Sequence, residues 1–324
     1  MVTANDLKGI MTMMPAFTTK DGDGIDATDT VDTDELARTV DKIIRDGGCN
    51  VLTTTGSFGE FHTLLWDEHK KLIEATVAAV KKRVPLFIGC THLNPREAIR
   101  QAKFAQDAGA DGLLLGVPFY YQASVDNAVQ FYHDVADALP KMGVMIYHNP
   151  THHRVTIPVS AFKKLTEKPN IVAMKDSHRT PLQFVELTNI TKGKMSIFVN
   201  QTQMFPYYQL GAAGCWSFNV WMGPSPVMAL RDACHNQNWD LAKQLCLDLE
   251  GLNRVGPNIG NLVWRENVFK LAVNHADYCT AGPLRAPWRI IPQEVTDNSK
   301  KIAAYWKTLC EKYPMVKESV RKTA

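Results

Sequence analysis

A lysine closes the short apolar run "IVAMK" at residues 171–175. The run has the length and composition of a strand buried on both faces, so Lys175 is expected where that strand leaves the core. One interpretation is an ordinary ion pair, with Asp176 or with a neighbouring loop. The other is a nucleophile: an unprotonated amine attacks a ketone to form a Schiff base, if desolvation or nearby positive charge lowers its pKa from about 10.4.

A tyrosine ends the preceding apolar run, "GVMIYH" at 143–148. In a barrel of parallel strands this places Tyr147 beside Lys175, at the same face. A phenol there can shuttle protons while a carbinolamine forms and a carbon–carbon bond breaks. A packing aromatic is the alternative for Tyr147 alone. The two residues together favour catalysis more than either does separately.

The turn "TGSFGE" at 55–60 carries two glycines and a serine. Gly56 and Gly59 allow the backbone to approach a ligand closely, and N–H groups in such a turn bind anions. Ser57 would add a hydroxyl hydrogen bond. Because the turn lacks the lysine of a phosphate-binding P-loop, a carboxylate is the expected ligand. A plain tight turn is the alternative.

These residues follow apolar runs that alternate with amphipathic stretches. The runs cover 9–14, 50–55, 84–90, 111–117, 143–148, 170–175, 195–200 and 214–219. Strands that alternate with helices predict an α/β protein, here a (β/α)8 TIM barrel over residues 1–237, with its chemistry at the C-terminal strand ends. A doubly wound sheet is the alternative, although no GxGxxG follows the first strand. Helical stretches near 238–252, 261–276 and 298–312 predict a C-terminal helical extension, 238–324, packed on the barrel.

Composition excludes several classes of function. The net charge of +3 comes without a basic stripe, which argues against a nucleic-acid partner. No charge-free window approaches 18 apolar residues, and no signal peptide is evident, so neither a membrane span nor secretion is expected. The seven cysteines are scattered without a CxxC pair, which predicts a cytoplasmic protein without a zinc or disulfide framework. The acidic stretch 20–32 lacks the glycine of a calcium-binding loop.

Four motifs, "GSFGE", "PFYY", "YHNP" and "AMKDS", resemble in order and spacing the pyruvate-dependent class I aldolase superfamily, over about residues 8–290. Dihydrodipicolinate synthase and N-acetylneuraminate lyase are its best-known members. The resemblance implies a TIM barrel, usually a homotetramer. It also implies Lys175 as the residue that forms an imine with the pyruvate carbonyl, and Tyr147 as the proton shuttle. No metal or other cofactor is implied.

The same resemblance implies further ligands. Ser57, with the backbone at Phe58, matches the loop that binds the pyruvate carboxylate. Tyr120 or Tyr121, in "PFYY", would complete a proton relay, in some members from a neighbouring subunit.

Three departures from the family pattern point to the substrate. Phe58 replaces a hydroxyl residue of the loop, His152 stands where dihydrodipicolinate synthase has an arginine, and Trp216 replaces small hydroxyl residues. They resemble the hydratase-aldolases of polycyclic aromatic degradation. That branch implies cleavage of an ortho-substituted trans-benzylidenepyruvate to an aromatic aldehyde and pyruvate, with Trp216 as a wall against the ring. Asn267 matches a branch asparagine that could position the hydrating water; a surface asparagine is the alternative.

The stretch after the fifth run, "YHNPTHHRV", is rich in basic side chains. His148, His152, His153 and Arg154 could hold an ortho carboxylate or phenolate, which slightly favours a carboxylated ring, and His178 could add to the cluster. A solvated polar loop is the alternative. Metal ligation is not expected, because no carboxylate accompanies these histidines at a suitable spacing.

Three other functions stay open. The first is another pyruvate-dependent lyase or synthase of the superfamily, acting on a sugar acid or a semialdehyde. The second is a non-catalytic oxo-acid sensor on the same barrel. The third, a metal-dependent barrel aldolase, is the weakest, because the strand ends lack a plausible ligand set.

Overall fold

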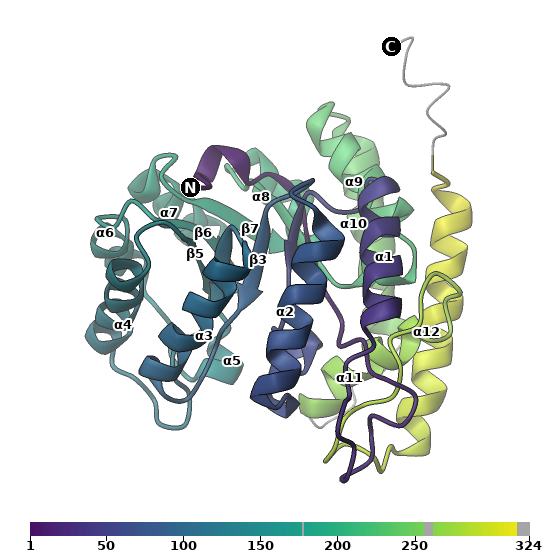
Figure 1. Cartoon of the computed structure of the whole chain (residues 1–324). Helices are drawn as coiled ribbons and strands as arrows, with labels where there is room; N and C mark the ends of the chain where they lie inside the picture. Colours follow the sequence, from purple (N-terminus) through teal and green to yellow (C-terminus); the bar gives the residue numbers. More distant parts are fainter. Residues whose placement is uncertain (177, 256–261, 316–324) are drawn as a thin grey trace.

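The computed structural model describes residues 1–176, 178–255 and 262–315, and it contains a closed barrel of eight parallel strands (Figure 1). The strands are β1 (Gly9–Met13), β2 (Val51–Thr53), β3 (Leu86–Gly89), β4 (Gly112–Leu115), β5 (Gly143–Tyr147), β6 (Ile171–Lys175), β7 (Ser196–Asn200) and β8 (Gly214–Ser217). They pair in chain order, and β8 closes on β1. The predicted TIM barrel is confirmed, with every strand inside its predicted run.

Helices surround the barrel and continue beyond it. The α-helices are α1 (Thr33–Arg45), α2 (Trp66–Val80), α3 (Pro95–Ala108), α4 (Val125–Ala138), α5 (Pro150–His153), α6 (Phe162–Leu165), α7 (Pro181–Thr191), α8 (Met204–Gln209), α9 (Ser225–His235), α10 (Trp239–Val255), α11 (Leu262–Val273) and α12 (Gln293–Lys312). Short 3-10 turns are η1 (Ala4–Asp6), η2 (Ser57–Gly59), η3 (Phe61–Thr63), η4 (Val159–Ala161), η5 (Gln201–Gln203) and η6 (Asn219–Met222). Within the described residues, none of these helices is long and apolar enough to span a membrane.

Helix boundaries follow local capping chemistry. In α1 the Asp32 side chain accepts a hydrogen bond from the backbone N–H of Glu35, which satisfies a free donor of the first turn. In α3 Asn94 caps the N-terminus, Pro95 takes the first helical position, and Gly109 ends the helix with φ +106°. Both helices therefore begin at residues whose side chains satisfy the free backbone donors of the first turn.

Two apolar cores hold the strands in place. One lies between the strands and the surrounding helices. The other fills the barrel interior, where Phe87 and Met145 pack beneath Tyr147 and Trp216. Inward-facing side chains of such a barrel form a packed core rather than a pore, so polar chemistry is confined to the strand ends.

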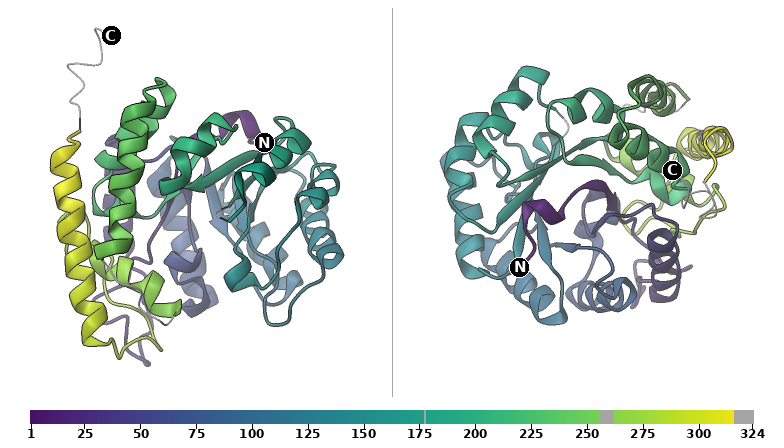
Figure 2. Two further views of the ribbon diagram at one scale, coloured as in Figure 1. Left: turned by 180° about the vertical axis from the view of Figure 1, so that it is seen from behind. Right: turned by 90° about the horizontal axis from the view of Figure 1, so that it is seen from above.

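The C-terminal helices pack against one side and one end of the barrel (Figure 2). α12 lies beside α10 on the outside, whereas α11 covers the end toward which the strands run (Figure 1). The predicted extension thus reaches the barrel mouth, although residues 256–261 and 316–324 lie outside the described part. All seven cysteines are free.

Candidate active site

Lys175 is enclosed by aromatic rings at the end of β6. Its side chain is 5% exposed. The Nζ atom lies 3.9 Å from the ring centroid of Trp216 and 5.3 Å from that of Tyr147. Among the residues that the structure describes, no carboxylate forms an ion pair with this amine, so the ion-pair interpretation is not supported.

Burial changes the acidity of the two residues at the strand ends. It lowers the pKa of Lys175 to about 8, against the opposing negative charges of Glu266 and Asp176. Burial, with a smaller effect of the Glu266 charge, raises the pKa of Tyr147 to about 12. At pH 7 the Lys175 amine is therefore neutral in about one tenth of the molecules, while Tyr147 keeps its proton.

Ser57 connects the glycine turn to this pair. Its Oγ lies 3.0 Å from the Tyr147 hydroxyl. Phe58, the next residue, stacks on Phe218 with ring centroids 4.8 Å apart. The turn thus contributes one hydroxyl and one apolar ring, as its sequence predicts.

Two adjoining cavities meet at the barrel mouth. The inner one, of about 40 Å³, contains the Lys175 amine and is also lined by Tyr147, Trp216 and Phe58. The outer one, of about 380 Å³, is largely aromatic. Its lining residues are Ser57, Phe61, His62, Phe119, His152, His153, Val263, Glu266, Asn267 and Trp288. A small inner cavity that holds an amine and a phenol, next to a wide aromatic chamber, suits a molecule with an oxo acid at one end and a flat ring at the other.

A still larger cavity, of about 1020 Å³, opens at the N-terminal ends of the strands. Lys8 and Arg231 belong to its lining, whereas Lys175 does not. In TIM barrels that end serves stability and the opposite end carries the chemistry.

Glu266 was missed by the sequence analysis. Its Oε1 lies 2.6 Å from Nε2 of His152, and the residue lines both the inner and the outer cavity. Burial raises the pKa of Glu266, but hydrogen bonds from His152 and Ser57 and the charges of His152 and Lys175 outweigh it, so the pKa falls below its ordinary value. Glu266 is thus a carboxylate at neutral pH.

The other predicted residues divide into two groups. His153 and Asn267 lie in the outer cavity with His152. Asn267 is 9% exposed, and its Nδ2 has no hydrogen-bond partner within the described parts of the chain. The alternative prediction, a surface asparagine, is therefore wrong. A buried amide without a partner needs a hydrogen bond to a water or a ligand.

Tyr120, Tyr121 and Arg154 are not brought to the two cavities. The tyrosines are 67% and 80% exposed. Arg154 is also exposed, and its guanidinium donates to the Tyr120 carbonyl at 3.0 Å. A relay through either tyrosine across a subunit boundary stays a prediction.

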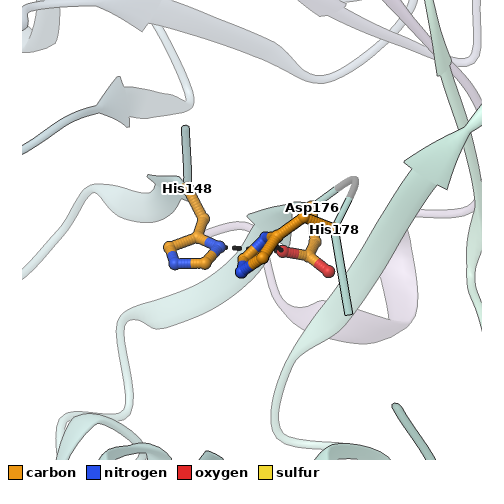
Figure 3. Close-up of side chains that lie close together, drawn as sticks. All are labelled: His148, Asp176 and His178. Atoms are coloured by element: carbon orange, nitrogen blue, oxygen red, sulfur yellow. Dashed lines mark hydrogen bonds and ion pairs between the residues drawn. The ribbon is translucent and has the colours of Figure 1, made fainter. Parts of the chain in front are cut away.

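The histidines nearest the strand ends surround Asp176 (Figure 3). His148 Nδ1 lies 2.8 Å from Asp176 Oδ1, and His178 Nδ1 lies 3.3 Å from the same oxygen. The expectation that no carboxylate accompanies these histidines is wrong, because Asp176, the residue after β6, contacts both His148 and His178. His148 Nε2 accepts the backbone N–H of Ile157, so its Nδ1 carries the proton that is donated to Asp176.

This arrangement occupies both nitrogens of His148, which argues for a structural hydrogen-bond network over a metal site. The Asp176 carbonyl in turn accepts the indole N–H of Trp216 at 2.8 Å. The network consequently fixes the ring that covers Lys175. Neither His148 nor His178 belongs to the lining of the two cavities.

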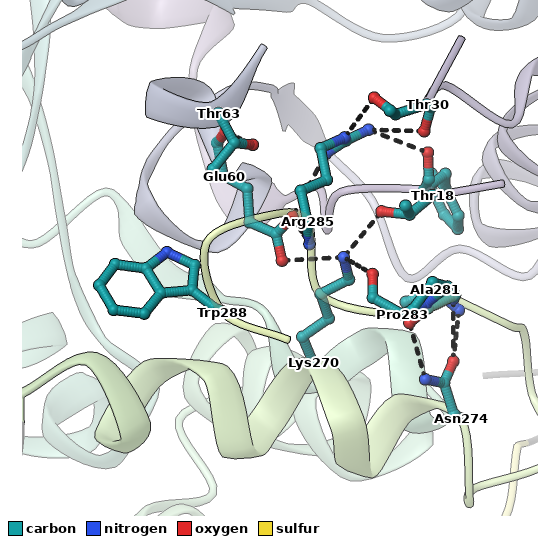
Figure 4. A network of polar contacts seen from close by, with 12 residues as sticks. Thr18, Thr30, Glu60, Thr63, Lys270, Asn274, Ala281, Pro283, Arg285 and Trp288 are labelled. Atoms are coloured by element: carbon teal, nitrogen blue, oxygen red, sulfur yellow. Dashed lines mark hydrogen bonds and ion pairs between the residues drawn. The ribbon is translucent and has the colours of Figure 1, made fainter. Parts of the chain in front are cut away.

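A second buried network joins the glycine turn to the C-terminal extension (Figure 4). Glu60, the last residue of "GSFGE", pairs with Lys270 Nζ at 2.8 Å and with Arg285 at 3.3 Å. Lys270 also donates to Thr18 and to the Pro283 carbonyl. These ion pairs are almost fully buried, so they hold the turn and α11 in one position.

The fold and site define a (β/α)8 barrel with a desolvated lysine at its mouth. Residues 7–269 match the model of the dihydrodipicolinate synthetase family, and the chain belongs to that family.

Several relatives are similar over nearly the whole chain. The trans-O-hydroxybenzylidenepyruvate hydratase-aldolase of Pseudomonas aeruginosa is 30% identical, with 96% of each chain covered. The trans-2'-carboxybenzalpyruvate hydratase-aldolase of Nocardioides sp. (strain KP7) is 29% identical, also with 96% of each covered. The solved structure of PhdJ bound to a substrate intermediate has a TM-score of 0.90 at 30% identity, covering 96% of this chain and 99% of that one.

Proposed function

We propose that this protein is a hydratase-aldolase that cleaves an ortho-substituted trans-benzylidenepyruvate to an aromatic aldehyde and pyruvate. The observation that carries the proposal is the buried Lys175 amine, without an ion pair among the described residues, between the rings of Tyr147 and Trp216 at the floor of an aromatic chamber. The full-length similarity to hydratase-aldolases supports it.

The chemistry begins when the Lys175 amine attacks the 2-oxo carbon and the carbinolamine loses water, with Tyr147 as proton donor. The resulting iminium draws electrons through the conjugated double bond, so water adds at the carbon that bears the ring. The bond between that carbon and its neighbour then breaks, and the aldehyde leaves. Protonation and hydrolysis of the remaining enamine release pyruvate. Because the iminium is the electron sink, this scheme uses no metal or other cofactor.

The outer cavity favours an ortho hydroxyl group over an ortho carboxylate. Burial lowers the pKa of His153 to about 4 and also lowers that of His62, so both rings are neutral at pH 7. His152 is engaged by the carboxylate of Glu266, and no lysine or arginine lies among the lining residues that the structure describes. The ortho carboxylate of a substrate would lie near the Glu266 carboxylate without a free cation to pair with it. The slight preference for a carboxylated ring, which was drawn from the histidine-rich stretch, is therefore reversed.

The chamber also argues against the alternatives. Sugar acids need many hydrogen-bonding groups, whereas Phe61, Phe119 and Trp288 present apolar rings. An oxo-acid sensor would not need the hydroxyl contact between Ser57 and Tyr147.

We extend the proposal to a homotetramer in the cytoplasm. The exposed Tyr120 and Tyr121 are available for a contact between subunits, and the seven free cysteines fit a reducing compartment. Sedimentation equilibrium tests the tetramer.

The test of the proposed reaction is the loss of ultraviolet absorbance of 2-hydroxybenzylidenepyruvate and of 2'-carboxybenzalpyruvate, with chromatographic detection of pyruvate and the aldehyde. We expect both products in equal amounts, and faster turnover of the hydroxy compound. Turnover of a sugar acid, with neither aryl substrate consumed, would reject the proposal.

A further inference from the structure

We propose that Glu266 is the general base at the ring-bearing carbon: its carboxylate takes a proton from the attacking water and, later, the proton of the resulting hydroxyl. This inference rests on the proposed function and assigns a role to a residue that neither the family motifs nor the sequence analysis singled out.

Glu266 lies where the reacting carbon of the substrate is expected. The substrate's oxo-acid end belongs in the inner cavity with Lys175, and its aryl ring belongs in the outer one. The ring-bearing carbon therefore lies where the two cavities meet. Only Ser57 and Glu266 line both of them, and Glu266 is the only carboxylate among the described lining residues of either. A base for this carbon has to sit at that junction.

Ser57 lies between Glu266 and Tyr147, the other group that can carry a proton. The Ser57 hydroxyl lies 3.0 Å from the Tyr147 hydroxyl, and Ser57 lines both cavities together with Glu266, whose pKa it helps to lower. A proton can thus pass from Glu266 through Ser57 to Tyr147, which stands beside the imine. Because Tyr147 keeps its own proton at neutral pH, it serves as a donor, and a separate acceptor is needed.

The residue next to Glu266 can hold the attacking water. Asn267, the next residue on α11, has a buried Nδ2 without a partner in the described structure and lines the outer cavity. A water that accepts a hydrogen bond from this amide and donates one to Glu266 would be held beside the substrate double bond.

Glu266, Ser57, Tyr147 and the imine can carry all the protons and electrons that the reaction transfers. In hydration, the water oxygen bonds to the ring-bearing carbon, Glu266 takes one proton, and the double-bond electrons move to the imine nitrogen to give an enamine. The proton returns through Ser57 and Tyr147 to the adjacent carbon, which restores the iminium. Glu266 then takes the hydroxyl proton, the carbon–carbon bond breaks, and its electron pair forms the second enamine. Protonation of that enamine, followed by hydrolysis, releases pyruvate.

His152 holds Glu266 but does not replace it. The imidazole Nε2 is 2.6 Å from the carboxylate and orients it across the chamber. We therefore assign His152 a positioning role. Loss of the imidazole should cost less activity than loss of the carboxylate.

The experiment compares wild type, Glu266→Gln, Glu266→Ala and His152→Gln, with Glu294→Gln, an exposed residue of α12, as the matched control. Each variant is assayed for turnover of 2-hydroxybenzylidenepyruvate and, separately, for borohydride trapping of pyruvate on Lys175. We expect Glu266→Gln to lose turnover by about 100-fold or more while its trapping stays within about threefold of wild type. His152→Gln should lose about tenfold, and Glu294→Gln should match wild type.

Rescue separates a base from a structural role. Formate, a small carboxylate, should restore part of the turnover of Glu266→Ala in proportion to its concentration, and should not affect Glu266→Gln. If Glu266→Gln does not fold, Glu266→Asp replaces it, with an expected loss of at least tenfold and normal trapping.

Two results would overturn the inference alone: near-wild-type turnover by Glu266→Gln, or equal losses for Glu266→Gln and His152→Gln without formate rescue of Glu266→Ala. Failure of wild type itself to cleave the substrate would overturn the proposed function as well, so the two failures are distinguishable.

Discussion

Tyr147 and Lys175 are paired across neighbouring strands, and the Lys175 amine lies 5.3 Å from the centre of the Tyr147 ring. The pairing follows from barrel topology, because parallel neighbours end at one face. It places a proton donor beside an amine that burial has made less basic. Ser57 extends this pair toward the outer cavity, where the aryl group of the substrate is expected.

The acidity of Lys175 predicts how imine formation depends on pH. Burial lowers the pKa of Lys175 to about 8 in the folded protein, so its neutral fraction rises from about one tenth at pH 7 to about nine tenths at pH 9. The initial rate of borohydride trapping with pyruvate should rise about ninefold over that interval and then level off. A rate that keeps rising tenfold per pH unit up to pH 10 would indicate an ordinary, solvated lysine.

Trp216 should matter more to activity than to stability. Trp216→Phe removes the 2.8 Å hydrogen bond to the Asp176 carbonyl and part of the ring that covers Lys175. We expect a loss of about 1 kcal/mol in the free energy of unfolding and a decrease of at least tenfold in kcat/KM.

The matched control is Trp306→Phe. It removes another buried hydrogen bond of an indole N–H, here to the Gly223 carbonyl at 2.9 Å, on α12 outside the barrel. It should show the same loss of stability with unchanged kcat/KM. Equal kinetic effects in both variants would contradict a specific role for Trp216.

Lys270 should help to position the turn that carries Ser57, through its ion pair with Glu60. Among the residues that the structure describes, Lys270→Met leaves Arg285 as the only ion-pair partner of Glu60. We expect the free energy of unfolding to fall by about 3 kcal/mol. Chemical denaturation measures this change. Trapping of pyruvate should slow as well, because Glu60 ends the turn that carries Ser57.

Lys312→Met is the control for this substitution, since Lys312 pairs with Asp248 at the surface and should change stability little. Equal stability changes in the two lysine variants would show that the Glu60 network does not hold the turn.

The hydrogen-bond network around Asp176 predicts that enzyme activity does not depend on a metal ion. Both ring nitrogens of His148 are engaged, by Asp176 and by the Ile157 N–H. Dialysis against a chelator should therefore leave turnover of the aryl substrate unchanged. Loss of activity that zinc or another divalent ion restores would refute this interpretation of the cluster.

Strand order and the inner part of the site could be predicted from the sequence because both follow local rules. Apolar runs mark buried strands, and residues at the ends of adjacent parallel strands must be neighbours. Lys175, Tyr147 and Ser57 all follow from this reasoning, and the structure brings them together.

The outer part of the site depends on long-range packing. Glu266 lies 114 residues from His152, on a helix whose sequence does not reveal which face meets the barrel. Conversely, the cluster of histidines and Arg154 was predicted as one group, but His148 turns to Asp176 and Arg154 turns to the Tyr120 carbonyl. Sequence proximity does not fix side-chain direction at such a turn.

The central claim is that Lys175 forms an imine with the substrate carbonyl. The most direct measurement is the intact mass of the protein after borohydride reduction in the presence of pyruvate, for wild type and for Lys175→Ala. The account predicts that wild type gains the mass of one reduced pyruvate, that the modified peptide contains Lys175, and that Lys175→Ala gains nothing. No adduct on wild type, or an equal adduct on Lys175→Ala, would contradict it.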